Sequence, residues 1–154
     1  MDFVKQYFSE TTEIINKLNF NVINKIISNL QILRTSGGRL FFLGVGGSAA
    51  NASHAVNDFR KLCNIESYAP TDNVSELSAR TNDEGWETVF SSWLETSKIS
   101  EKDGLFILSV GGGNKEKNVS TNLVNAIDLA KSKNSKIFGI VGKSDGYTYK
   151  STDL

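Results

Sequence analysis

His54 and Asp58 are four residues apart in a segment with helical spacing, and His54 is the only histidine of the chain. Residues at positions i and i+4 of a helix lie on the same side. The pair could bind a metal ion or act in proton transfer next to a carbonyl group. An exposed charge pair on a solvated helix face has the same spacing, and two side chains fall short of a closed zinc site. The spacing alone therefore leaves these interpretations open.

Two glycine-rich segments are candidates for binding an anion, because each follows a short apolar run. Glycine lets the backbone approach an anion closely, and the N–H groups at a helix start favour phosphate. The residues concerned are Gly46, Gly47, Ser48, Ser109, Gly111 and Gly112. Tight strand-to-helix turns without any ligand would use the same glycines. Neither segment continues as the Gly-Lys-Ser/Thr of a P-loop, and the first lacks the third glycine of a dinucleotide fingerprint.

Helical and strand-like patterns alternate along the chain and predict an α/β fold with a mostly parallel sheet covered on both faces. Residues 1–36 are expected to form two N-terminal helices. Strands are expected at 39–45, 65–69, 104–110 and 136–141, and further helices at about 47–61, 71–79, 85–98 and 119–133. No element is predicted after residue 141. In such a sheet, ligands collect where the carboxyl ends of the strands meet helix starts, which is where both glycine segments fall.

Composition narrows the class of protein. The 154 residues suit a single domain, residues 1–154, with an ordinary apolar fraction of 39%. Lys plus Arg and Asp plus Glu both number 17, a balance that argues against nucleic acid or an anionic membrane surface as the main partner. The apolar runs are too short to span a bilayer, and the N-terminus does not resemble a signal peptide. Cys63 is the only cysteine, so no internal disulfide can form, and a cytoplasmic protein is expected.

Residues 43–54 resemble the Gly-Asn-Gly-Gly-Ser-Ala-Ala-Asp-Ala-x-His segment of bacterial phosphoheptose isomerases, which belong to the sugar-isomerase (SIS) superfamily. The resemblance continues in order through 81–90, 104–109, 122–133 and 140–143. It implies a three-layer α/β sandwich of flavodoxin-like topology with a five-stranded parallel sheet. It also implies N-terminal helices that pack into a homotetramer, with a phosphosugar bound between subunits.

The resemblance also implies an activity, namely conversion of sedoheptulose 7-phosphate to a heptose 7-phosphate for cell-envelope sugars such as those of lipopolysaccharide, often with zinc. By position, His54 would be a metal ligand, and Asp58 would replace a family glutamate that serves as base and metal ligand. Ser48 would contact the substrate phosphate or sugar end. Asn82 and Asp83 would bind sugar hydroxyls or the open-chain carbonyl. Ser109 would begin the phosphate loop.

Several residues depart from the family pattern. Val45 replaces an asparagine, and the family's Ser-x-Ser-Gly-x-Ser loop is replaced by residues 109–114, with an apparent insertion at 115–118. Ser120 could restore a lost hydroxyl donor. The family completes its site with a C-terminal helix bearing a glutamine and a histidine, and no counterpart follows residue 154. Either the sequence is truncated, or the chain is a variant that binds the phosphosugar without the usual catalytic groups.

Three functions are therefore compared. An aldose–ketose isomerase acting on a phosphosugar is the leading hypothesis. A non-catalytic SIS module that binds a sugar phosphate for regulation or protein interaction is the alternative. A nucleotide-binding α/β domain is the weakest, because only Glu66 lies near the position of a ribose-binding acid.

Overall fold

A parallel sheet of four strands in the order β2-β1-β3-β4 lies at the centre of the computed structural model, which describes residues 2–152. The strands are β1 (Leu40–Leu43), β2 (Ser67–Tyr68), β3 (Gly104–Ser109) and β4 (Lys136–Val141). All three strand pairs are parallel. The expected fifth strand is wrong for the described residues, because the chain after β4 forms a short helix instead. The strand order otherwise agrees with a doubly wound sheet.

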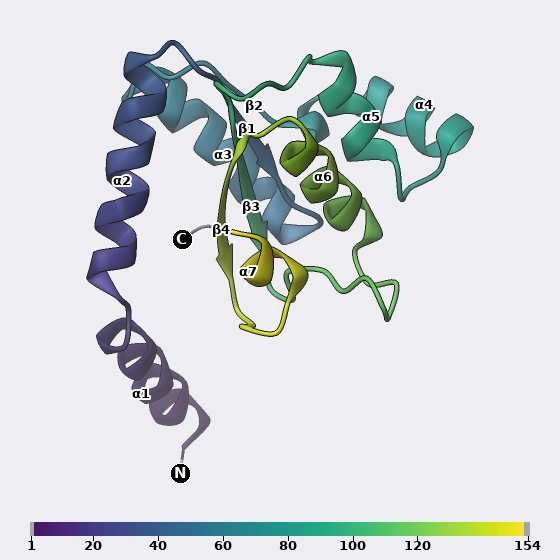
Figure 1. Cartoon of the computed structure of the whole chain (residues 1–154). Coiled ribbons are helices and arrows are strands. Elements are labelled where there is room, and N and C mark those ends of the chain that lie inside the picture. Colours follow the sequence, from purple (N-terminus) through teal and green to yellow (C-terminus); the bar gives the residue numbers. More distant parts are fainter. Residues whose placement is uncertain (1, 153–154) are drawn as a thin grey trace.

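Helices cover both faces of this sheet (Figure 1). They are α1 (Phe3–Asn16), α2 (Phe20–Thr35), α3 (Gly47–Lys61), α4 (Val74–Glu84), α5 (Val89–Thr96), α6 (Thr121–Ser132) and α7 (Tyr147–Ser151), with a 3-10 turn η1 (Pro70–Asp72). On one face, Phe41 and Ile107 pack with buried residues of α5 and α6. On the other face, Phe42 and Phe106 pack with Leu33 of α2 and with α3. The three layers follow because the central strands β1 and β3 are apolar on both sides.

Two helices begin later than the sequence predicts. The helix expected at 71–79 begins at Val74, because Asn73 caps it by accepting a hydrogen bond from the Glu76 N–H at 3.2 Å. The helix expected from residue 85 begins at Val89. Gly85 has φ of 95°, a left-handed conformation that breaks the helical path. As a result, Asn82 and Asp83 belong to the last turn of α4.

The N-terminal helices differ from the rest of the fold in how little they bury. No residue of α1 is buried, and Leu33 is the buried residue of α2. Helix α1 extends away from the sheet (Figure 1). Its apolar side chains are largely exposed, as for Phe3 at 77% and Phe8 at 64%. Among the described residues, no helix combines the length and the apolar character that crossing a membrane requires.

Candidate functional site

The first glycine turn, residues 44–48, connects β1 directly to α3. A Cβ atom on Gly44 would clash with the carbonyl oxygen of Ser48, so only glycine allows α3 to begin this close to the strand. Gly46 has φ of 61° and precedes α3 without a side-chain cap. No side chain caps the first turn of α3, where the N–H groups of Ser48 and Ala49 donate to the carbonyl oxygens of Val45 and Gly46 at 3.2 and 3.0 Å. The partial positive charge of such a helix start suits an anion. Ser48 lies half-buried in the first turn of α3.

The second glycine turn, residues 109–113, follows β3. The Ser109 Oγ accepts a hydrogen bond from the Gly112 N–H at 3.0 Å, which leaves the hydroxyl proton able to donate to a ligand. Gly112 and Gly113 have φ of 69° and 77°. The inserted residues that follow are closed by a bridge in which Asn114 and Val119 exchange backbone hydrogen bonds of 2.8 and 3.0 Å. The insertion therefore forms an ordered loop.

Helix α6 starts after this loop with an unusual backbone conformation. Ser120 lies at its N-terminus with φ 49° and ψ 49°, the left-handed region, and caps no backbone N–H with its side chain. The N-terminus of α6 therefore resembles that of α3 in lacking a side-chain cap. Such a terminus carries a partial positive charge that favours an anion.

Both glycine turns follow the carboxyl ends of their strands and therefore lie at the same end of the sheet. Leu43 at the end of β1 pairs with Ile107, two residues before Ser109, so the neighbouring strands end side by side. Val45 and Val110 are 40% and 75% exposed, so this edge is open to solvent. A cavity of about 230 Å³ lies away from the two glycine turns, between α2 and α3, and Phe59 is among the residues that line it.

His54 and Asp58 meet on α3 as their spacing predicts. The Nε2 of His54 lies 3.3 Å from the Oδ2 of Asp58, and their side chains are 78% and 43% exposed. Among residues 2–152 there is no group of three or more His, Cys, Asp or Glu side chains able to hold a metal ion. Two ligands do not complete a zinc site. The pair from one copy of the chain therefore does not fit zinc by itself.

Asn82 and Asp83 lie on the surface at the end of α4. The Asn82 Nδ2 donates to the Asp83 Oδ1 at 2.7 Å. No hydrogen bond among the described residues joins this pair to either glycine turn. Helix α4 lies at the outer side of the molecule, beyond α5 as seen from the sheet (Figure 1). The structure thus brings the two glycine turns together but leaves this predicted pair apart from them.

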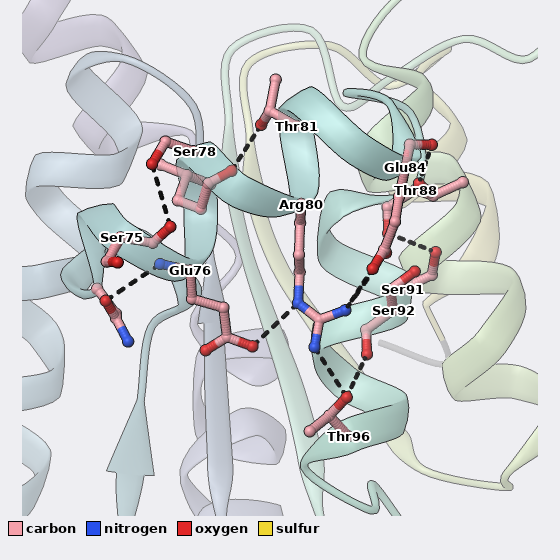
Figure 2. A network of polar contacts seen from close by, with 12 residues as sticks. Ser75, Glu76, Ser78, Arg80, Thr81, Glu84, Thr88, Ser91, Ser92 and Thr96 are labelled. Atoms are coloured by element: carbon pink, nitrogen blue, oxygen red, sulfur yellow. Dashed lines mark hydrogen bonds and ion pairs between the residues drawn. The ribbon is translucent and has the colours of Figure 1, made fainter.

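Arg80, which the sequence analysis missed, fixes α4 in place. Its guanidinium donates to Glu76 at 2.9 Å, to Glu84 at 3.3 Å and to the Thr96 Oγ1 of α5 at 2.9 Å (Figure 2). The Arg80 side chain is only 16% exposed. The signal in the sequence was the spacing of Glu76, Arg80 and Glu84, each four residues apart. The contact between Arg80 and Thr96 joins two helices, and no spacing in the sequence indicates it.

A second polar group joins the inserted loop to α6 and α7. The Lys115 Nζ donates to the Asp128 Oδ2 at 3.1 Å, and the Tyr147 hydroxyl donates to the Asp128 Oδ1. Burial alone would raise the pKa of Asp128, but hydrogen bonds from Tyr147 and Lys115 outweigh it and lower the pKa. The hydrogen bond to Asp128 also raises the pKa of Tyr147. Asp128 is therefore a carboxylate that holds the loop.

Comparisons with known proteins concern the chain as a whole. Residues 6–142 match the SIS domain family. A phosphoheptose isomerase of Glaesserella parasuis is 34% identical over 84% of the chain and 68% of the relative. A phosphoheptose isomerase of Syntrophotalea carbinolica is 27% identical over 98% of the chain and 78% of the relative. The structure of a phosphoheptose isomerase from Francisella tularensis shares the fold with a TM-score of 0.81 at 20% identity, covering 99% of this chain and 80% of that one.

Proposed function

The chain belongs to the SIS domain family, and from this premise we propose that it is an aldose–ketose isomerase acting on a phosphosugar. Sedoheptulose 7-phosphate is the proposed substrate and a heptose 7-phosphate the product, in the synthesis of cell-envelope sugars. The observation that carries the proposal is the pair of glycine turns at the ends of the adjacent strands β1 and β3. Each turn precedes a helix without a side-chain cap, and the His54–Asp58 pair lies on the first of these helices.

The glycine turns would bind the phosphate. The N-termini of α3 and α6 supply N–H donors and partial positive charge. Ser48 and Ser120 lie at these helix starts, Ser109 lies at the end of β3, and all three would add hydroxyl donors. Because Gly111 and Asn114 stand where the family pattern has serines, the backbone would supply more of the binding than in the family pattern.

The chemistry needs a base beside the sugar. Asp58 would remove a proton from C1 of the ketose while the C2 carbonyl oxygen gains a proton, giving an enediol. Loss of the proton from O1 and delivery of a proton to C2 then yield the aldose, so the reaction balances without a redox cofactor. His54, 3.3 Å from Asp58, would orient this carboxylate. Asn82 and Asp83 would bind sugar hydroxyls only if α4 reaches the site of a neighbouring copy.

Zinc and quaternary structure remain predictions. His54 and Asp58 would supply two zinc ligands, which is too few for a complete site, so no step is assigned to the metal. A homotetramer is proposed because the apolar side chains of α1, such as Phe3 and Phe8, are exposed and need a partner surface. Metal analysis and sedimentation of the purified protein test both. A cytoplasmic location is proposed as well.

A non-catalytic module that binds a sugar phosphate is the second candidate. It is favoured by the loss of hydroxyl groups from the second glycine turn and by the absence, among the described residues, of any hydrogen bond between that turn and the Asn82–Asp83 pair. Such a protein would bind the phosphosugar at the same turns without turning it over. The two candidates share one site and differ in what Asp58 does.

The test follows sedoheptulose 7-phosphate by NMR with purified wild type, Asp58→Asn, Ser48→Ala and the control Lys61→Gln, which changes an exposed residue at the end of α3. We expect Asp58→Asn to lose turnover but keep binding, and Ser48→Ala to bind more weakly. Lys61→Gln should behave as wild type. Full turnover by Asp58→Asn would assign the base elsewhere. Binding without any turnover by wild type would favour the non-catalytic module.

A further inference from the structure

Helix α7 packs directly against the second glycine turn. Thr148 is completely buried, and both its backbone N–H and its hydroxyl donate to the carbonyl oxygen of Gly112, each at 2.8 Å. The N–H of Tyr147 donates to the carbonyl oxygen of Gly113 at 2.8 Å. The first turn of a helix has N–H groups without partners inside the helix, so these bonds satisfy both segments. Three donors of α7 thus hold two carbonyl groups of the turn.

The packing around α7 is close at two glycines. A Cβ atom on Gly146 would clash with the carbonyl oxygen of Gly111 and lie 3.2 Å from the Cα of Gly112. On the opposite side, a Cβ atom on Gly139 of β4 would lie 2.7 Å from the Cγ2 of Thr148. Thr148 is therefore held between β4 and the glycine turn, and its hydroxyl has a fixed direction.

The direction of the carbonyl groups matters for binding an anion. A backbone segment attracts an anion with its N–H groups and repels it with its carbonyl oxygens. Gly112 and Gly113, with φ of 69° and 77°, can rotate more freely than other residues. Without donors from α7, either carbonyl could turn toward the ligand. With them, both carbonyl groups point at α7.

We propose that Thr148 is a positioning residue for the phosphate group, because its hydroxyl and N–H turn the Gly112 carbonyl away from the ligand. The proposal rests on the proposed function in taking the second glycine turn as the phosphate site. Thr148 itself is buried and touches no ligand. Its role is to keep the turn in the conformation that accepts an anion.

Two substitutions separate the hydroxyl from the shape of the side chain. Thr148→Val removes the hydroxyl at nearly constant volume, and Thr148→Ser keeps the hydroxyl and removes the methyl group. Tyr149→Phe is the matched control on the same helix, because Tyr149 is 58% exposed and its side chain makes no hydrogen bond to the turn among the described residues. Calorimetry on the full chain measures the dissociation constants of sedoheptulose 7-phosphate and inorganic phosphate. Amide hydrogen exchange measures the order of residues 111–113.

We expect Thr148→Val to weaken binding of both probes about fivefold, the size of one net hydrogen bond. KM should rise by the same factor with kcat little changed, and exchange at residues 111–113 should become faster. Thr148→Ser and Tyr149→Phe should keep the wild-type affinity and exchange. If Thr148→Val does not fold, Thr148→Ala replaces it in the test. Alanine also lacks the hydroxyl, and it places no methyl group against the Gly112 carbonyl.

The outcomes distinguish this inference from the proposed function. If wild type binds neither probe, the proposed phosphate site fails, and exchange at residues 111–113 still tells whether Thr148 orders the turn. If wild type binds but Thr148→Val shows unchanged affinity and unchanged exchange, the positioning role is overturned. Equal weakening by Thr148→Ser would also overturn it, because packing rather than the hydroxyl would then be responsible.

Discussion

Replacing Asp103 with asparagine should destabilise the fold strongly, because this carboxylate is buried and accepts five hydrogen bonds. Its side chain is 3% exposed. The Oδ1 accepts from the backbone N–H and the Nε of Arg39, both at 3.0 Å. The Oδ2 accepts from the Arg39 Nη2 at 2.8 Å and from the N–H and hydroxyl of Ser100 at 2.9 and 3.0 Å. Asparagine keeps one oxygen, so at least two of the five donors lose their acceptor and face the amide N–H groups instead.

The magnitude follows from the burial of the two partners. Breaking a fully buried ion pair by removing one partner costs about 3–5 kcal/mol. The Arg39 side chain is 27% exposed and also donates to the carbonyl oxygens of Ser97 and Lys98, so water and these bonds offset part of the loss. We therefore expect the lower end, about 3 kcal/mol, which is a large share of the roughly 5–15 kcal/mol that stabilise a typical domain.

The effect should depend on pH in a defined direction. Burial alone would raise the pKa of Asp103, but hydrogen bonds from Arg39 and Ser100 outweigh it and lower the pKa. A carboxyl whose folded pKa lies below its unfolded pKa contributes stability above the unfolded value and loses it as pH falls through the folded one. The difference between wild type and Asp103→Asn should be full at pH 7 and shrink below about pH 4.

Urea unfolding at one protein concentration, at pH 7, 5 and 3, measures the free energy of unfolding of wild type and Asp103→Asn. Glu101→Gln is the control, because it removes an exposed carboxylate two residues away. Glu101→Gln should stay within about 0.5 kcal/mol of wild type. A difference below about 1 kcal/mol for Asp103→Asn at pH 7 would refute the reasoning, since a surface pair would explain it. A difference that stays constant down to pH 3 would refute the assigned pKa direction.

Two further predictions concern the second glycine turn and the start of α6. Gly146→Ala would press a Cβ atom on the Gly111 carbonyl, whereas Gly38→Ala would press one on the Lys102 carbonyl at the amino end of the sheet. Both substitutions should lower the free energy of unfolding by about 1–3 kcal/mol and so lower the melting temperature. Only Gly146→Ala should also weaken phosphosugar binding, as measured by calorimetry. Ser120→Gly should raise stability by up to about 1 kcal/mol, because it removes a left-handed serine, yet weaken phosphosugar binding. Unchanged affinity would remove Ser120 from the site.

The main elements could be predicted from the sequence because each is a local pattern. The strands β1, β3 and β4 are apolar runs bounded by glycine or polar residues, and α3 and α6 carry helical spacing. Helix α7 could not be predicted, since five residues are too few to show a period. Its stability comes from contacts such as that of Thr148 with Gly112, which lies 36 positions away in the chain. The expected fifth strand came from the family resemblance and not from any pattern in the chain.

The candidate site likewise contains some contacts that the sequence predicts and others that it does not. The His54–Asp58 contact follows from a spacing of four on one helix, and the structure contains it at 3.3 Å. That the two glycine turns share an edge follows from the parallel order of the sheet. By contrast, the Arg80 contact with Thr96 and the Lys115 contact with Asp128 join different elements. No local rule finds such contacts, because they depend on how the elements pack.

Left-handed residues occur at both ends of the sheet, whereas the buried Arg39–Asp103 ion pair lies at the amino end. At the amino end, the buried Asp103 binds Arg39 and Ser100 and joins the starts of β1 and β3. At the carboxyl end, Gly46, Gly112 and Ser120 adopt left-handed conformations. For serine this conformation costs about 1–2 kcal/mol, and it persists only where the surrounding structure determines it. Left-handed residues also precede strands at the amino end, at Asn64, Lys98 and Asn134, so this conformation alone does not distinguish the two ends. What distinguishes the carboxyl end is that two helices, α3 and α6, begin there without a side-chain cap from the preceding residue, which is the feature that favours an anion.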